Sequence, residues 1–205
     1  MANEEHVGKI EEGAEAWNLW RIDNPDIDPD LSGANLSKAN LYGANLNGVD
    51  LSGADLGGAN LSEAVIYKAN LSGANLSGAD LSGANLNLAN LINAVFRKAT
   101  LTGASLWQIQ RDGWVIEGVI CEQFYDDKLG KHKVPKGRDF ERGEFERFFT
   151  SLPTFEYIFE NGMHPLDPFF MNQVAEEISR QNPEYELEVD SIKVKGDKPS
   201  IKFTV

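Results

Sequence analysis

The chain has little cysteine and histidine and no long apolar run. Its single cysteine, Cys121, excludes an intrachain disulfide and offers no thiolate cluster for a metal. The three histidines lie far apart in the sequence, and we expect them to be surface or internally satisfied side chains. No run of about 18 apolar residues is present, and the acidic start lacks the basic region of a signal peptide. We therefore expect a soluble, cytoplasmic protein that does not bind membranes.

Basic charge is also scarce, and no catalytic motif is present. The formal net charge is −13, with 32 acidic residues against 19 basic ones, and the basic residues form no patch that would favour direct binding of nucleic acid. The sequence shows no nucleophile with a base at useful spacing, no phosphate-binding glycine loop and no metal-ligand spacing. We expect a protein without enzymatic activity, cofactor or metal.

What the sequence does contain is a repeat of five residues. From Ala69 to Asn87 it reads "ANLSGANLSGADLSGANLN". On an α-helix a step of five turns each leucine by about 140° from the last, so no apolar stripe forms. On a straight strand an odd step sends successive leucines to opposite faces. The pattern instead predicts a chain that bends at each Ser-Gly pair and coils around its leucines.

The register of this repeat runs without a gap over sixteen positions from Leu31 to Leu106. Every central residue from Leu36 onward has alanine two residues before it, with Val49 as the exception. The predicted core is Leu36, Leu41, Leu46, Leu51, Leu56, Leu61, Ile66, Leu71, Leu76, Leu81, Leu86, Leu91, Phe96 and Leu101.

This tandem A[DN]LxG pattern, from Asp30 to Trp107, resembles the pentapeptide-repeat protein family. The resemblance implies a mainly β fold, a right-handed quadrilateral β-helix with four pentapeptides in each coil. Sixteen repeats would form four coils, a column about 20 Å long at the usual interstrand spacing of about 4.8 Å.

Some members of that family mimic DNA and bind type II topoisomerases such as gyrase, which gives an alternative function. A DNA mimic needs negative charge along its coils. From Leu31 to Trp107, however, the acidic and basic residues are equal in number, because the acidity lies in the flanking segments. We keep this DNA-mimicking function as the alternative to a non-enzymatic protein-binding or scaffold function.

The segments on both sides of the repeats are expected to cap the solenoid. Apolar residues at helical spacing predict one amphipathic helix over residues 3–21, within a capping segment 1–29. An uncapped end would expose backbone edges and leucine core. The four tryptophans lie at the borders of the repeats, and we assign them to the caps: Trp17, Trp20, Trp107 and Trp114. We place the β-helix at 30–109.

Residues 110–205 are predicted to form a small α+β module. "GWVIEGVICEQFYDD" is typical of a strand, followed by a turn and a short return from Val134. Helical spacing from Phe145 favours a helix, although Phe140 and Phe145 also fit a partial extra coil. A strand from Thr154, a helix from Asp167 through Gln181 and a C-terminal hairpin complete the module. This module is a second alternative location of function, as a ligand-binding or catalytic unit.

Columns of residues twenty apart predict one apolar edge on the solenoid. We expect its members to gather on an otherwise small and polar surface: Val65, Tyr67, Leu88, Ile92 and Trp107. Exposed apolar clusters mark binding surfaces. The occupant is expected to be a protein: an unknown partner, a second copy in a homodimer, or the chain's own C-terminal module.

Overall fold

The computed structural model describes residues 2–150, 154–158, 188–193 and 200–204, with side chains described up to residue 149. The chain divides into two compact units, Met1–Arg147 and Phe148–Val205. Each unit is described by itself.

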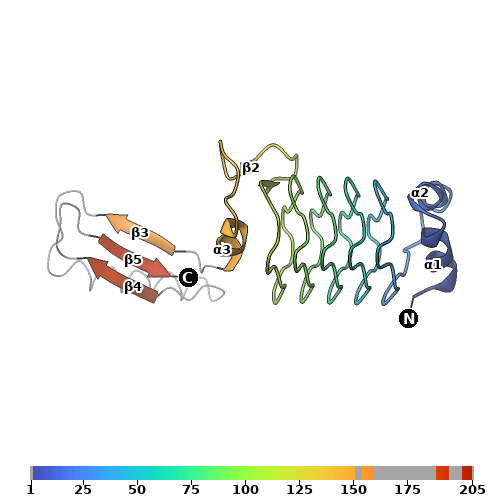
Figure 1. Cartoon of the computed structure of the whole chain (residues 1–205), viewed down its shortest axis with the longest axis horizontal. Coiled ribbons are helices and arrows are strands. Elements are labelled where there is room, and N and C mark those ends of the chain that lie inside the picture. The colour runs from blue at the N-terminus through green and yellow to red at the C-terminus, as the bar shows by residue number, and fades with distance from the viewer. Residues whose placement is uncertain (1, 151–153, 159–187, 194–199, 205) are drawn as a thin grey trace. The chain divides into compact units, whose positions relative to one another are not determined.

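The first unit is built on a stack of coils (Figure 1). Parallel bridges join residues twenty apart, starting with Asp30↔Asp50 and ending with Ser105↔Tyr125. Twenty residues are four pentapeptides, so each coil has four sides. The fourteen predicted core residues are 0–3% exposed, with the alanines of the repeat packed beside them. Burying a leucine side chain contributes about 1.5–3 kcal/mol, so this column of apolar side chains dominates the stability of the coils.

The coils continue past residue 109, which corrects the end of the solenoid expected from the sequence. Bridges Asn90↔Gln110, Val95↔Val115 and Thr100↔Ile120 add further sides with the same spacing of twenty. The sequence hides this fifth coil, because Ile116 and Cys121 occupy leucine positions and Val119 an alanine position. All three are buried nonetheless. The segment expected to be a straight strand is therefore bent into the solenoid.

At most corners of the coils, an asparagine or aspartate that precedes the central residue fixes the turn. The side-chain Oδ1 of Asn75 accepts hydrogen bonds from the backbone N–H of Ser77 at 3.2 Å and from its hydroxyl at 2.7 Å. The Nδ2 of Asn75 donates to Oδ1 of Asp55, one coil earlier, at 2.9 Å. Asparagine and aspartate thus form the turn and also connect neighbouring coils.

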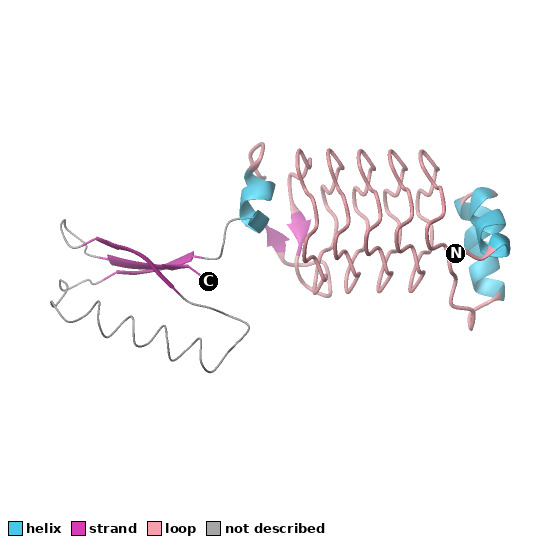
Figure 2. Ribbon diagram, turned by 90° about the horizontal axis from the view of Figure 1, so that it is seen from below, coloured by secondary structure: helices cyan, strands magenta, loops and turns pink. Residues whose placement is uncertain are grey.

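Two helices stand at the N-terminal end of the stack, where the sequence predicted one. Helix α1 spans Glu4–Glu11 and α2 spans Ala14–Asp23. The chain turns between them at Gly13, whose φ of 107° is a conformation that favours glycine. Asn3 caps α1 by accepting hydrogen bonds from the backbone N–H groups of Glu5 and His6. The turn lets two short helices, in place of a single long one, cover the end of the stack (Figure 2).

The last side of the fifth coil is also the first strand of a short hairpin, and a helix follows the hairpin. Strand β1, Phe124–Tyr125, pairs antiparallel with β2, Lys133–Val134, so the expected turn and return from Val134 are present. Helix α3 spans Glu144–Thr150. Phe145 on α3 is 1% exposed and packs against Phe124 of β1 at a ring distance of 5.8 Å. The helix that the spacing of the phenylalanines favours is therefore observed in place of an extra coil.

The second unit contains a three-stranded antiparallel sheet. Its strands are β3, Thr154–Ile158, β4, Glu188–Lys193, and β5, Ser200–Thr204, in the order β3-β5-β4. The expected strand from Thr154 and the C-terminal hairpin are present. The predicted helix from Asp167 through Gln181 lies outside the described residues.

Candidate interaction surfaces

Among the described residues, the candidate contact surfaces are the apolar edge, the N-terminal end and the C-terminal end of the stack. We call the apolar edge the interaction edge, defined by Val65, Tyr67, Leu88, Ile92 and Trp107. Val65 is 40% exposed. The other four side chains are half-buried at corner positions of the coils.

One column of the interaction edge runs through Tyr67, Asn87 and Trp107. The backbone N–H of Trp107 donates to Oδ1 of Asn87 at 2.9 Å. Asn87 is only 4% exposed, and the ammonium of Lys68 lies 5.4 Å from the centre of the Tyr67 ring. Trp107 is thus part of the wall of the fourth coil. This corrects its assignment to a cap, because a further coil follows it.

Leu88 gives the edge its most unusual backbone feature. Its φ is 61°, in the left-handed region that glycine adopts at the same corner position in most repeats. The other non-glycine residues with positive φ are polar or charged, such as Asn93 with a φ of 58°. A branched apolar residue in this region costs about 1–2 kcal/mol. The backbone N–H of Leu88 donates to the carbonyl of Trp107 at 2.9 Å, which places both residues on adjacent coils.

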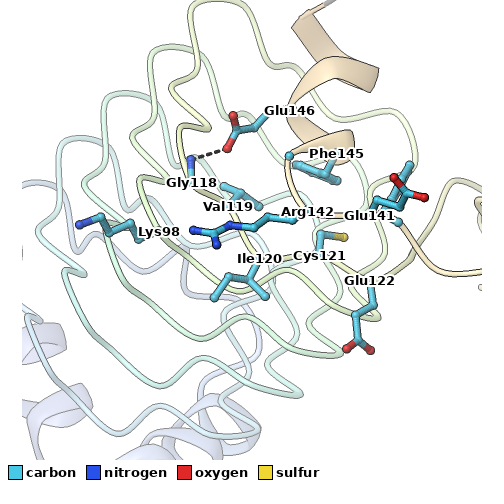
Figure 3. Close-up of a pocket in the computed structure, with 12 residues that line it drawn as sticks. Lys98, Gly118, Val119, Ile120, Cys121, Glu122, Glu141, Arg142, Phe145 and Glu146 are labelled. Carbon is cyan, nitrogen blue, oxygen red and sulfur yellow. Dashed lines mark hydrogen bonds between the residues drawn. The ribbon is translucent and has the colours of Figure 1, made fainter.

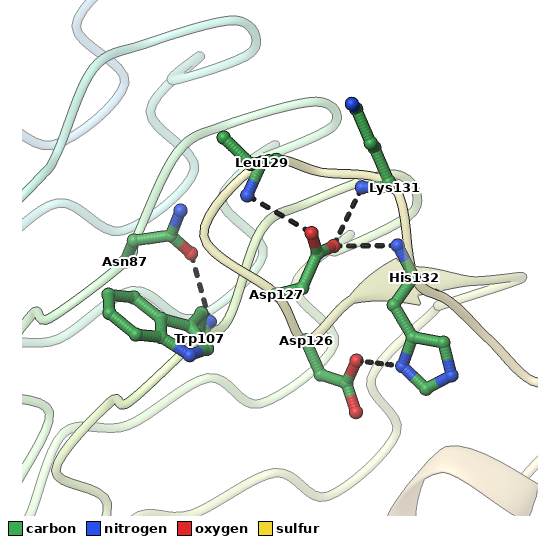
Figure 4. A network of polar contacts seen from close by, with 7 residues as sticks. All are labelled: Asn87, Trp107, Asp126, Asp127, Leu129, Lys131 and His132. Carbon is green, nitrogen blue, oxygen red and sulfur yellow. Dashed lines mark hydrogen bonds and ion pairs between the residues drawn. The ribbon is translucent and has the colours of Figure 1, made fainter.

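The hairpin loop between β1 and β2 closes the C-terminal end of this column (Figure 4). Asp127, twenty residues after Trp107, accepts backbone hydrogen bonds from Leu129 at 3.1 Å and from Lys131 and His132 at 2.6 Å each. These bonds, led by that from His132, lower the pKa of Asp127 below its ordinary value. Asp126 contacts Nδ1 of His132 in the same loop.

At the N-terminal end, side chains of α2 bond to backbone groups of the first coil that would otherwise face an earlier coil. The indole Nε1–H of Trp17 donates to the carbonyl of Asn45 at 2.8 Å. Oδ1 of Asn18 accepts the N–H of the same Asn45 at 2.7 Å, and a guanidinium nitrogen of Arg21 donates to the carbonyl of Asn47 at 3.1 Å. Trp17 is fully buried.

A second side of the same end is closed by α1 and the residue before it. The backbone N–H of Asp30 donates to Nδ1 of His6 at 3.0 Å, and the carbonyl of Asp30 accepts from the N–H of Asn3 at 3.1 Å. His6 is a buried, hydrogen-bonded histidine whose ring lies 5.2 Å from that of Trp20. Trp20 in turn stacks on Trp17 at 5.2 Å. The two N-terminal tryptophans therefore sit together in the cap.

At the C-terminal end Trp114 occupies an alanine position of the fifth coil. Its ring lies 5.8 Å from Phe96 of the coil before and 6.4 Å from Phe145 of α3. The carboxylate of Glu146 accepts the backbone N–H of Gly118. Nearby, Arg138 forms a hydrogen-bonded ion pair with Glu144, which lowers the pKa of that carboxyl to about 2.

A cavity of about 750 Å³ lies between the fifth coil and the start of α3 (Figure 3). Its walls come from Val119, Ile120, Cys121, Phe140 and Phe145, with charged residues around them. Cys121 is buried and its Sγ–H donates to the carbonyl of Leu101 at 3.6 Å. Burial raises the pKa of this thiol to about 12. Sequence reasoning missed this cavity, because its walls come from two separate segments, 118–122 in the fifth coil and 140–146 at the start of α3.

The described residues include no group of three His, Cys, Asp or Glu side chains placed to hold a metal ion. In the part of the chain that the structure describes, no helix has the length and apolar character needed to cross a membrane.

Comparison with known proteins agrees with the coil geometry. The family profile of pentapeptide repeats matches residues 30–66 and 69–108, with eight copies. The chain is a pentapeptide-repeat protein. Proteins of this family fold as right-handed quadrilateral β-helices. No curated protein matches the chain.

Solved pentapeptide-repeat structures resemble parts of the chain. A protein of the Arabidopsis thaliana thylakoid lumen is 36% identical, covering 44% of this chain and 63% of its own, with a TM-score of 0.43. HetL, involved in heterocyst differentiation regulation in the cyanobacterium Nostoc, is 31% identical over 54% of this chain and 47% of its own, with a TM-score of 0.34. Another Nostoc pentapeptide-repeat protein is 32% identical over 50% of this chain and 74% of its own, with a TM-score of 0.12. The chain thus spans less than two thirds of the first two relatives.

Proposed function

We propose that the chain is a non-enzymatic protein-binding or scaffold protein that contacts its partner through the interaction edge. The observation that carries the proposal is Leu88. A leucine held at a φ of 61° is locally unfavourable, and its neighbours at equivalent corners are glycine or polar residues. Strained residues of this kind persist only where the surrounding structure holds them in place, and they cluster at functional sites.

The surroundings of Leu88 support the same reading. Val65, Tyr67, Ile92 and Trp107 add apolar surface, whereas the corners elsewhere on the coils consist mostly of glycine and of polar or charged residues. Exposed apolar groups on a rigid wall offer a contact surface that loses little conformational entropy on binding. The parallel bridges on every side of the coils provide that rigidity.

The charge of the coils favours this function over DNA mimicry. The fifth coil adds three acidic residues, Asp112, Glu117 and Glu122, and the basic residue Arg111. Arg97 of the fourth coil pairs with Glu117 at 3.3 Å. The solenoid therefore lacks the continuous negative surface of a duplex. An assay of supercoiling by gyrase separates the two functions, since a DNA mimic inhibits the reaction and a scaffold for another partner leaves it unchanged.

The test of the interaction edge is affinity capture with the immobilised full chain. Tyr67→Ser combined with Leu88→Ser should remove most of the captured partner. Tyr42→Ser is the matched control, because Tyr42 is 59% exposed at the same corner position on a different face. Equal capture by the double variant and the unmodified protein would contradict the proposal.

A second variant separates binding from stability. Leu88→Asn introduces asparagine at this corner. Asparagine already occupies the next corner, where Asn93 has a φ of 58°. Asparagine tolerates the left-handed region, so the free energy of unfolding should stay equal or rise by up to about 1 kcal/mol. Capture should fall all the same. A variant that loses stability but keeps its partner would show that Leu88 serves the fold alone.

A further inference from the structure

The side of the solenoid that contains Ile120 joins its coils through the same pair of backbone groups each time. The N–H of Thr100 donates to the carbonyl of Ala79, and the carbonyl of Thr100 accepts from Leu81. One coil later the N–H of Ile120 donates to the carbonyl of Ala99 at 2.8 Å, and its carbonyl accepts from Leu101 at 2.8 Å. One residue of each new coil thus bridges two groups of the coil before it.

The fifth coil presents this pair of groups again, and both lie at the cavity. By the same geometry they are the carbonyl of Val119 and the N–H of Cys121, which line the cavity of about 750 Å³. Neither has a hydrogen-bond partner among the described residues. An open pair of this kind is the edge of a sheet, and an extended chain can bond to it as an added strand.

The neighbouring carboxylate of Glu146 shows which kind of group can bind at the open end of the fifth coil. In the interior coils the N–H at the corner donates to a carbonyl of the next coil, as Lys98 does to Glu117 at 2.9 Å. At Gly118 the carboxylate of Glu146 occupies the place of that carbonyl. The side-chain carboxylate of Glu146 thus replaces the backbone carbonyl that a following coil would provide.

The side chains around the open pair define what an added strand would carry. Val119 and Cys121 are 7% and 8% exposed and continue the inward columns, so small and medium apolar side chains stack on them. Five charged residues line the cavity: Glu122, Glu141, Glu146, Lys98 and Arg142. The side chains of Lys98 and Arg142 have no ion-pair or hydrogen-bond partner among the described residues. In Figure 3 the guanidinium of Arg142 points into the cavity, whereas the carboxylate of Glu122 points away from it.

We propose that this cavity binds an extended acidic segment of a partner protein by strand addition to Val119–Cys121. One residue of the segment donates its N–H to the carbonyl of Val119 and accepts from the N–H of Cys121. Its neighbours stack on the side chains of Val119 and Cys121. Lys98 and Gly118 each lie two positions before the bridging residue of their own coil, Thr100 or Ile120. An acidic residue two positions before the bridging residue of the added segment therefore lies beside them.

The probe for the test is the fluorescein-labelled peptide Glu-Ala-Thr-Leu, blocked at its C-terminus, with binding read by fluorescence anisotropy. Threonine is its bridging residue. N-methylation of the threonine removes the bond to the carbonyl of Val119 and should weaken binding about tenfold. Binding should also slow hydrogen exchange at the amide of Cys121, which a peptide bound elsewhere would leave unchanged.

Variants of the protein test the charges. Lys98→Gln with Arg142→Gln should weaken binding several-fold, whereas Glu146→Gln should strengthen it by removing a like charge beside the acidic residue. Lys38→Gln is the matched control, since Lys38 has the same corner position and a φ of 58°, three coils earlier in the same column. No binding at millimolar peptide, equal binding of the N-methylated peptide, or equal effects of Lys98→Gln and Lys38→Gln would each overturn the inference.

This inference rests on the proposed protein-binding function but uses a different surface. Tyr67→Ser with Leu88→Ser leaves the cavity unchanged and should leave peptide binding unchanged. If the peptide fails to bind while capture depends on the interaction edge, only strand addition is overturned. If the peptide binds and capture ignores the edge, only the role of the edge is overturned.

Discussion

The indole Nε1–H of Trp17 is bonded at 2.8 Å to the carbonyl of Asn45, a backbone group of the first coil with no earlier coil to face. A side chain of the cap therefore takes the place that a backbone N–H takes between all later coils. The cap is thus an integral part of the hydrogen-bond pattern of the solenoid, and its removal leaves buried polar groups without partners.

Trp17→Phe should lower the free energy of unfolding by about 1–3 kcal/mol, because the carbonyl of Asn45 loses its donor in a partly buried place. Trp20→Phe is the matched control. Trp20 is half-buried and no hydrogen bond of its indole to the described residues is found, so its replacement should cost less than about 1 kcal/mol. Urea unfolding of both variants measures the difference, and equal losses would show that the bond to Asn45 is unimportant.

Leu76→Ala should cost about 2–5 kcal/mol, because Leu76 is fully buried in an interior coil and the change leaves a cavity. Ser77→Ala removes only the hydroxyl that donates to Asn75 at 2.7 Å, and should cost less than about 1 kcal/mol. Urea melts of the two adjacent variants are compared directly. Similar losses would be incompatible with the observed inward and outward positions.

The loop around Asp127 should loosen in acid. Because its folded-state pKa is lowered, the stabilisation is complete above the ordinary pKa of about 3.9 and is lost as the pH falls through the folded pKa. NMR shifts of the Lys131 and His132 amides should hold down to about pH 4 and then move. Asp127→Asn should produce a similar shift at pH 7, and Asp112→Asn, which changes an exposed side chain of the fifth coil, should not. Unchanged NMR shifts of the Lys131 and His132 amides in Asp127→Asn would contradict this role of Asp127.

Cys121 should react with iodoacetamide far more slowly in the native protein than in the unfolded chain. Burial raises its pKa from 9.0 to about 12, so the thiolate is scarce at pH 8. The rate in urea should exceed the native rate at least about 100-fold. Stability should also decline above about pH 9, where the unfolded thiol ionises and the folded one does not. Native reactivity equal to that of the unfolded chain would show that Cys121 is accessible.

The repeat could be predicted from the sequence because its geometry is local and periodic. A step of five with small residues beside each leucine fixes which side chains face inward, and a period of twenty fixes the columns, such as that of Tyr67, Asn87 and Trp107. The end of the solenoid could not be read in this way. Cys121 and Ile116 fill the inward positions with other apolar residues, and only the neighbouring coil shows that they still stack.

Several other features of the structure depend on contacts or backbone angles that no local sequence pattern specifies. Gly13 breaks the predicted N-terminal helix, although a single glycine inside a helix costs only about 1 kcal/mol and is often tolerated. The bond between Glu146 and Gly118 joins residues 28 positions apart, and the cavity exists only because α3 returns to the fifth coil. The backbone angle of Leu88 likewise follows from its corner position once the register is known, but nothing in its own identity suggests it.

The four-sided coil also determines how the molecule can change in length. Insertion of twenty residues adds one full coil and returns the chain to the same angular position. The cap formed by α1 and α2 and the β1–β2 hairpin then keep their angular relation. Insertion of a single pentapeptide instead rotates one end by about a quarter turn about the long axis against the other. The number of repeats therefore determines the angle between the two ends about the long axis. A duplication keeps the interaction edge and the terminal cavity in the same angular relation only if it adds a multiple of four pentapeptides.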